Sequence, residues 1–234
     1  MKKRILSLLL ALVMITTLLP LGLYDTAWAA EVSETAEATE IASGNCGTGG
    51  VEDSSVRWVL GEDGTLTISG TGAMCDWGTP WQEFRSQINR VVIESGVTTV
   101  GSDAFSNCDN LTAAELPGTL TAIGDHAFAW SNIAEIAIPY GVVTIGAGAF
   151  QETKLADVVI PDSVTTIEES AFRYCWEMKT LHLGSGLTTV EGYAFDRCKA
   201  AVTLSADNRA FVLEDNALLN AEKTRLIQYF DALV

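Results

Sequence analysis

From about residue 88 onward, hydrophobic positions recur with a fixed period. An Ala-Phe pair returns five times, and an aliphatic residue stands five positions before each Phe. The intervals are 23, 22, 22 and 23 residues, between Phe105, Phe128, Phe150, Phe172 and Phe195. One copy cannot bury these side chains alone, whereas stacked copies place each column in a continuous ladder. A period of roughly 20 to 29 residues therefore predicts a leucine-rich-repeat solenoid.

The segments between the Ala-Phe pairs alternate between apolar and variable positions. The clearest copies are residues 133–139 (Ile-Ala-Glu-Ile-Ala-Ile-Pro) and 155–161 (Leu-Ala-Asp-Val-Val-Ile-Pro). Alternation with a period of two requires extended backbone. The proline ends the strand because it cannot donate a ladder hydrogen bond. The pattern predicts a mainly β solenoid of about five 22–23-residue repeats over residues 88–205.

A separate β-rich module is expected at residues 45–87. Two alternating runs, 56–60 and 65–69, flank a Gly-Glu-Asp-Gly turn and predict a β-hairpin. Four aromatic residues add apolar surface, namely Trp58, Trp77, Trp81 and Phe84. We interpret the module as a cap over the open end of the solenoid. A carbohydrate-stacking site is the alternative interpretation of the aromatic cluster.

The first 44 residues indicate export. Lys2, Lys3 and Arg4 precede an apolar run, and Ala27-Trp28-Ala29 is a small-x-small cleavage site, so residues 1–29 are predicted to be a secretory signal peptide. An uncleaved anchor is the alternative, because the run approaches the roughly 20 residues that span a bilayer. Residues 30–44 are small and acidic, typical of a flexible linker. We expect a secreted or cell-surface protein with no membrane span after cleavage.

Charge and cysteine content narrow the possible partners. With 14 Lys+Arg against 30 Asp+Glu, the net charge of -16 would repel a phosphate backbone, so nucleic acid is not an expected partner. The five cysteines form no metal-binding spacing, and an odd number leaves at least one thiol unpaired within the chain. An extracellular location permits disulfides. Cys46 and Cys75 bracket one predicted module and are the best candidate pair.

The sequence contains no recognisable catalytic pattern. It lacks a Gly-x-Ser-x-Gly nucleophile motif, a P-loop and a dinucleotide-binding glycine motif. The two histidines, His126 and His182, lie in different repeats without a partner at metal-ligand spacing. We therefore expect a protein that is not an enzyme and that carries no cofactor or metal.

The repeat unit V-T-x-I-G-x-x-A-F-x-x-C-x-x-L-x-x-I-x-I-P resembles the BspA-type leucine-rich repeat of bacterial surface proteins. Residues 206–234 resemble the hairpin-like insert that interrupts such arrays, or an incomplete repeat. The resemblance implies adhesion to host or matrix proteins and carries no shared catalytic residues. Because the insert usually leads into further repeats, it also implies an open C-terminal end available for self-association.

Two surfaces are candidates for binding a protein. The outward side of the repeated strands would carry Glu115, Glu135, Asp157, Val159 and His182, and loop aromatics would add Trp130, Tyr174 and Trp176. A rigid repeated face suits a protein ligand, and exposed aromatics are typical interface anchors. Packing of the aromatics against neighbouring loops is the alternative. The competing functions are carbohydrate binding through Trp77, Trp81, Trp130 and Trp176, and a shortened, self-associating structural role.

Overall fold

The computed structural model describes residues 39–76 and 79–230. The predicted signal peptide and residues 30–38 of the predicted linker lie outside the described residues. The described residues form one compact unit in which almost every element is a β-strand. None of the helices within the two described ranges is long and apolar enough to cross a membrane.

The described chain begins with three antiparallel strands, β1 (Glu40–Asn45), β2 (Val56–Gly61) and β3 (Thr65–Gly70). The predicted hairpin is confirmed, and its turn closes with a 3.0 Å bond from the Gly64 amide to the Gly61 carbonyl. The linker prediction is wrong for residues 40–44, because β1 pairs with β2 from Glu40 to Asn45, with one register shift between Glu40 and Ala42. Strand pairing uses main-chain hydrogen bonds, which do not depend on side-chain polarity. A polar, acidic segment can therefore pair as a strand here. A short 3-10 helix, η1 (Gly50–Glu52), connects β1 and β2.

A row of parallel strands follows β3. It comprises β5 (Arg90–Ile93), β7 (Ala113–Glu115) and β9 (Glu135–Ile136), and then β11 (Asp157–Ile160), β13 (Thr180–Leu183) and β15 (Ala201–Leu204). β3, β5, β7 and β9 are joined in register, as are β11, β13 and β15. In the described part of the chain no pairing joins β9 to β11. This gap is called the sheet break below, and the outward side of the row is called the strand face.

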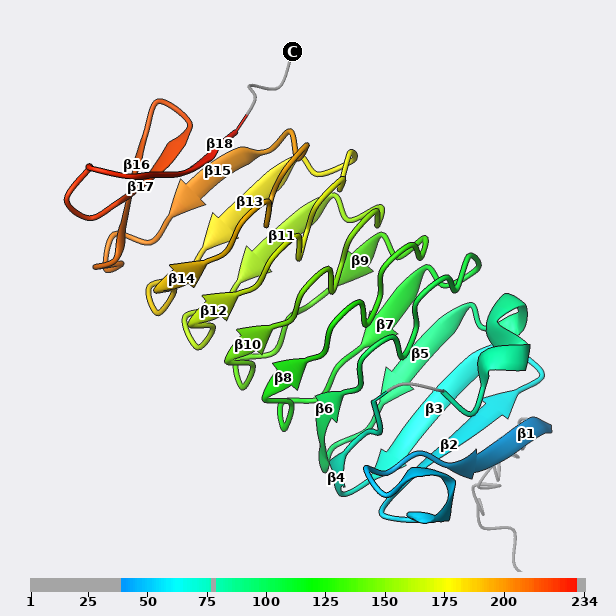
Figure 1. The fold of residues 1–234 in the computed structure, drawn as a ribbon. Helices are drawn as coiled ribbons and strands as arrows, with labels where there is room; N and C mark the ends of the chain where they lie inside the picture. Colours follow the sequence, from blue (N-terminus) through cyan, green and yellow to red (C-terminus); the bar gives the residue numbers. More distant parts are fainter. Residues whose placement is uncertain (1–38, 77–78, 231–234) are drawn as a thin grey trace, which may run out of the picture. The chain divides into compact units, whose positions relative to one another are not determined.

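A second row of parallel strands runs without interruption. It consists of β4 (Gly72–Ala73), β6 (Val97–Val100), β8 (Ala122–Ile123), β10 (Thr144–Ile145), β12 (Thr166–Ile167) and β14 (Thr189–Val190). Figure 1 shows the two rows side by side, with one strand of each row in every turn. The fold class predicted from the hydrophobic period, a β solenoid, is confirmed.

The core is an aromatic ladder between the two rows. The five phenylalanines stack with ring centroids 5.1–5.4 Å apart and interplanar angles of 2–26°. Trp81 stacks on Phe105 at 5.7 Å, and its indole N–H donates to the Ala104 carbonyl at 2.8 Å. Phe230 packs against Phe195 at 5.7 Å and 51°. All seven rings are buried, so the ladder extends one ring beyond the predicted column at each end.

This ladder changes the interpretation of the N-terminal module. β3 belongs to the first row, β4 to the second and Trp81 to the ladder, so the module contains the first turn of the solenoid. A second 3-10 helix, η2 (Gln82–Gln87), follows Trp81 and leads into β5. Trp58 covers the outer side of this turn, with its ring 5.9 Å from that of Trp81.

The Ala-Phe turns share an unusual backbone. In each turn, the residue two positions before the Phe and the residue two positions after it have a φ between 51° and 65°. Nine of these ten residues are not glycine, namely Asp103, Asn107, His126, Trp130, Glu152, Ser170, Tyr174, Tyr193 and Arg197. The amides of Phe105, Phe128 and Phe150 donate to carbonyls of the next turn at 2.7–2.8 Å. These bonds between turns hold the left-handed conformation, which costs non-glycine residues about 1–2 kcal/mol each.

The chain continues after β15 into a three-stranded antiparallel sheet, formed by β16 (Phe211–Glu214), β17 (Ala217–Asn220) and β18 (Leu226–Tyr229). Leu218 and Phe230 from this segment are buried. The expectation of an open C-terminal end is wrong for the ladder, because Phe230 covers Phe195. The outer edge of β15 has no strand partner among the described residues.

Candidate binding surface

The strand face carries a hollow at the sheet break. Its volume is about 700 Å³, and it extends over β5, β7, β9 and the start of β11. Apolar residues form part of the lining, namely Ala113, Ala114, Ala134, Ile136, Ala137 and Ala156. Charged residues complete it, namely Arg90, Glu115, Glu135, Lys154, Asp157 and Glu177.

Small side chains and a missing hydrogen-bond ladder explain this hollow. Ala137 takes the outward position that Val159 occupies in the next turn, so the surface is lower there by the size of the side chain. The backbone bonds from Ala134 to Thr112 and from Lys154 to Ile133 join the turns just before the strands. Beyond them β9 and β11 are not paired. The strand face therefore loses both side-chain bulk and backbone continuity at one place.

The charged lining is acidic, with four carboxylates and two cations. Arg90 forms an ion pair with Glu115, and Lys154 forms one with Glu177 at 3.2 Å. These side chains are about half exposed, so each pair is worth only about 0–1 kcal/mol and exchanges readily with other charges. Glu135 and Asp157 have no cation partner in the part of the chain that the structure describes. Asp157 instead accepts a 2.5 Å hydrogen bond from the Thr180 hydroxyl.

The structure places all five predicted strand-face residues on the strands of this row, and three of them at the hollow. Glu115, Glu135 and Asp157 line it, whereas Val159 and His182 lie beyond it on β11 and β13. Val159 is 61% exposed, and His182 Nδ1 lies 3.0 Å from the Thr203 hydroxyl. The five predicted site residues include none of the cations or alanines, although Arg90, Ala113 and Ala137 belong to the strand face that the alternation predicts. The run of alanines at 113, 114, 134, 137 and 156 was the signal available in the sequence.

The predicted loop aromatics form two separate pairs. Trp130 stacks on the His126 ring at 5.6 Å, and Tyr174 stacks on Trp176 at 5.5 Å. These contacts agree with packing between neighbouring loop side chains, although Trp176 remains 57% exposed.

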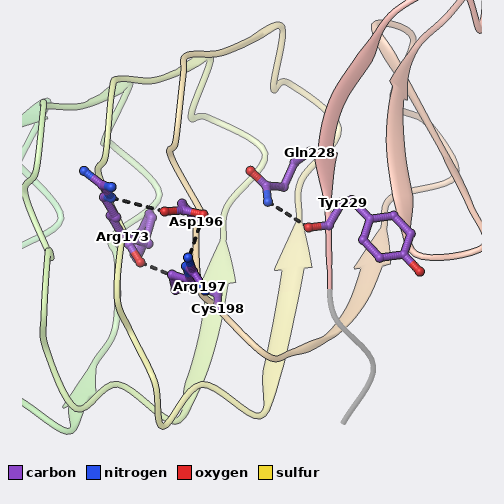
Figure 2. A network of polar contacts seen from close by, with 7 residues as sticks. Arg173, Asp196, Arg197, Cys198, Gln228 and Tyr229 are labelled. Atoms are coloured by element: carbon purple, nitrogen blue, oxygen red, sulfur yellow. Dashed lines mark hydrogen bonds and ion pairs between the residues drawn. The ribbon is translucent and has the colours of Figure 1, made fainter.

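Arg173 organises the surroundings of the second aromatic pair. Its guanidinium lies 4.5 Å from the Tyr174 ring centroid and 5.2 Å from that of Tyr193. It also forms a 3.2 Å ion pair with Asp196, which Arg197 approaches from the other side (Figure 2). Two cations therefore share one carboxylate beside three exposed or half-buried aromatic rings.

The proposed carbohydrate-stacking set is not one surface. Trp81 is fully buried in the ladder, and Trp77 lies outside the described residues. The prediction that Trp81 offers an exposed platform is wrong, because its ring is the first of the stacked column. Trp130 and Trp176 remain as surface tryptophans.

The five cysteines lie in the interior as thiols. Burial raises the pKa of the Cys108 thiol to about 12, which keeps it protonated and unreactive at neutral pH. The hydrogen-bond contact with Cys175, followed by burial, raises the pKa of Cys198. Cys46 and Cys75 lie opposite each other beside an antiparallel bridge, and their pairing stays a prediction. No cluster of three or more possible metal ligands occurs in the described ranges.

A solenoid with 22–23-residue turns, one buried Phe per turn and a strand in each row defines a leucine-rich-repeat protein. The model of the BspA type leucine-rich repeat region matches residues 83–219 in six copies, which is more than half of the chain. The chain therefore belongs to this family. The Ala-Phe spacing predicted about five repeats, because it did not register the partial copies that flank the five Ala-Phe pairs.

Solved structures support the same fold. The chain is 33% identical to a leucine-rich repeat protein from Eubacterium ventriosum, with a TM-score of 0.73 over 82% of this chain and 52% of that one. It is 18% identical to the pneumococcal vaccine antigen PcpA, with a TM-score of 0.51 over 76% of this chain and 55% of that one. The chain thus spans about half the length of these structures. No curated protein matches it.

Proposed function

We propose that this chain is an exported, non-catalytic binding protein that engages a protein partner through the hollow on its strand face. The observation that carries the proposal is the combination of an alanine-lined hollow of about 700 Å³ with two carboxylates, Glu135 and Asp157, that form no ion pair with any described residue. Adhesion to host or matrix proteins, which the family resemblance implies, is the biological role that fits such a surface.

The hollow suits a lysine or arginine side chain of the partner. The methyl groups of the alanines accept the aliphatic stem of such a side chain, which packs against apolar surface while its charged end stays polar. The carboxylates accept the charge-assisted hydrogen bonds of an ammonium or guanidinium group. The chain's net charge of -16 adds long-range attraction for a basic partner.

The test measures binding of the protein to a panel of purified extracellular-matrix proteins by biolayer interferometry, with and without the double substitution Glu135→Lys/Asp157→Lys. The matched control is Glu62→Lys/Glu83→Lys, which changes the net charge equally at two exposed positions away from the hollow. We expect the hollow variant to weaken binding at least about 10-fold, or 1.4 kcal/mol, and the control to change it much less. Equal losses of binding affinity in the two variants would show that net charge alone causes the effect, and the hollow would then be rejected as the site.

Carbohydrate binding at the exposed aromatics is the second candidate. Trp176 and Tyr193 are 57% and 61% exposed. Tyr193 lies beside the Arg173 guanidinium, and Trp176 stacks on Tyr174, the other ring beside that guanidinium. A glycan array probed with the protein and with Trp176→Ala tests it. A saturable hit that the substitution abolishes would support this candidate, whereas a protein hit lost in Trp130→Ala/Tyr174→Ala would place the protein-binding site on the loops instead.

Self-association is the third candidate, and the structure limits where it can occur. Because Phe230 covers the ladder, a second copy at this end of the repeats would pair with the outer edge of β14 or β15, the terminal strands of the two rows in the described residues. Light scattering over a range of concentrations distinguishes the cases, since a constant monomer mass excludes this interface.

A further inference from the structure

Two cysteines meet where the two strand rows begin. Cys46 directly follows β1, which is the outermost strand of the first row, and Cys75 lies two residues after β4, which is the outermost strand of the second. An antiparallel bridge pairs Gly47 with Met74 and so sets Cys46 opposite Cys75. The Cys75 amide donates to the Cys46 carbonyl at 2.8 Å.

This placement satisfies the distance requirement of a disulfide. Residues directly opposite in an antiparallel pair have Cα atoms roughly 4.5–5.5 Å apart, and disulfides span Cα separations of about 4.4–6.8 Å. Both side chains are buried, with 0% and 8% of their surface exposed. Burial, followed by the charge of Cys75, raises the pKa of the Cys46 thiol to about 12.

We propose that Cys46 and Cys75 form a disulfide in an oxidising compartment, and that this bond joins the two strand rows across the first turn of the solenoid. A low-molecular-weight disulfide is the oxidant. During folding, before the first turn closes over the two thiols, one cysteine thiolate attacks it and releases one thiol, and the second cysteine attacks the resulting mixed disulfide and releases another. Two protein thiols and one oxidant disulfide thus become one protein disulfide and two small thiols.

The bond has a structural consequence at an exposed end. β1 and β4 are the outer strands of their rows, and nothing described beyond them holds their outer edges together. Closing the loop between residues 46 and 75 lowers the entropy of the unfolded chain, which stabilises the folded one. The disulfide should therefore protect the first turn, including Trp81, from fraying.

The Cys175 and Cys198 thiols contact each other in a different arrangement. They occupy the same position in consecutive parallel turns, and their sulfur atoms donate to the Phe150 and Phe172 carbonyls at 3.1 and 2.9 Å. Each is a satisfied interior donor in a regular column. A Cys175–Cys198 disulfide is therefore the main alternative to a Cys46–Cys75 disulfide in a test of cysteine pairing.

The experiment refolds the full chain from reduced, unfolded protein by dilution into a buffer of reduced and oxidised glutathione. Free thiols are then blocked with N-ethylmaleimide, and the protein is digested without reductant for mass spectrometry. We expect three blocked thiols out of five and a peptide in which Cys46 is linked to Cys75. Circular dichroism before blocking confirms that the refolded protein is β-structured.

Matched variants make the result decisive. Cys108→Ser should keep the Cys46–Cys75 peptide, whereas Cys75→Ser should remove it and leave four thiols. Reductant should lower the melting temperature of the natural chain by about 5 °C or more and leave that of Cys75→Ser unchanged. Five free thiols in the refolded protein, or a Cys175–Cys198 bond in place of the proposed one, would overturn the proposal.

Discussion

Removing one ring from the aromatic ladder tests whether the stacked column holds the solenoid together. Phe150 stands at the centre, fully buried, with the Phe128 ring at 5.4 Å and 2° on one side and the Phe172 ring at 5.1 Å and 15° on the other. The substitution Phe150→Ala leaves a cavity bounded by both neighbours. No other aromatic ring is recorded within stacking distance to fill it in the described part of the chain.

The expected cost follows from burial and stacking. Deleting a buried Phe side chain costs about 3–5 kcal/mol, with the larger values where the site cannot collapse. Each stacked pair contributes about 0.5–1.5 kcal/mol beyond burial, and Phe150 loses two such pairs. We expect a decrease of about 4 kcal/mol in the free energy of unfolding, and about 1 kcal/mol less for Phe230→Ala, whose ring meets one neighbour at 51°.

Urea denaturation followed by circular dichroism measures this difference. Tyr140→Ala is the matched control, because Tyr140 is 73% exposed and its loss should change stability by at most about 0.5 kcal/mol. Combining Phe150→Ala with Phe172→Ala should give a non-additive result, whereas combining it with the distant Phe105→Ala should be additive. A loss below 1.5 kcal/mol for Phe150→Ala, or one equal to that of Tyr140→Ala, would refute the view that the ladder is the main source of stability.

Three further predictions concern the backbone and the surface. Glu152 has a φ of 55°, so Glu152→Gly should be about 1 kcal/mol more stable than Glu152→Ala in thermal denaturation, and equal stability would mean that the turn stores no strain. Gly64→Ala should destabilise the protein by about 2 kcal/mol in urea, because φ is +77° and a Cβ would lie 2.7 Å from the Gln87 carbonyl oxygen; a change below 0.5 kcal/mol would contradict this. The Ser185 amide, at 2.6 Å, lowers the pKa of Asp162 below its usual value of 3.8. A lowered carboxyl pKa stabilises the fold above the unfolded pKa, and this contribution is lost as the pH falls through the folded pKa. The difference in melting temperature between the natural chain and Asp162→Ala should therefore shrink between pH 5 and pH 2, and a constant difference would show that the carboxylate charge is not involved.

The sequence predicted the parts of the fold that repeat. A column of identical residues at a near-constant interval has one simple physical explanation, and the Phe ladder confirms it. The two ends of the ladder could not be found in this way. Trp81 lies 24 residues before Phe105 and lacks the Ala-Phe pair, and Phe230 lies 35 residues after Phe195 in an antiparallel segment. Each ring joins the ladder because the fold brings it against the end of the column, and a search for a repeated residue pattern does not detect such a contact.

The sequence predicted which face of the strands carries the candidate site, but it did not predict the hollow in that face. A period of two placed Glu115, Glu135 and Asp157 on the strands of one row, and the structure finds them there. The hollow between them forms where β9 and β11 are not paired by backbone hydrogen bonds. Their residues are as compatible with pairing as those of neighbouring turns, so no single position in the sequence indicates the break.

The sheet break also determines how the solenoid responds to load. The second strand row and the bonds between Ala-Phe turns are continuous past this point, whereas the first row has no backbone bonds between β9 and β11. Bending that widens the strand face there stretches no ladder hydrogen bond, while bending in the opposite sense compresses packed side chains. The two turns that contain β9 and β11 are therefore joined less rigidly on the strand face than the neighbouring turns of the described chain.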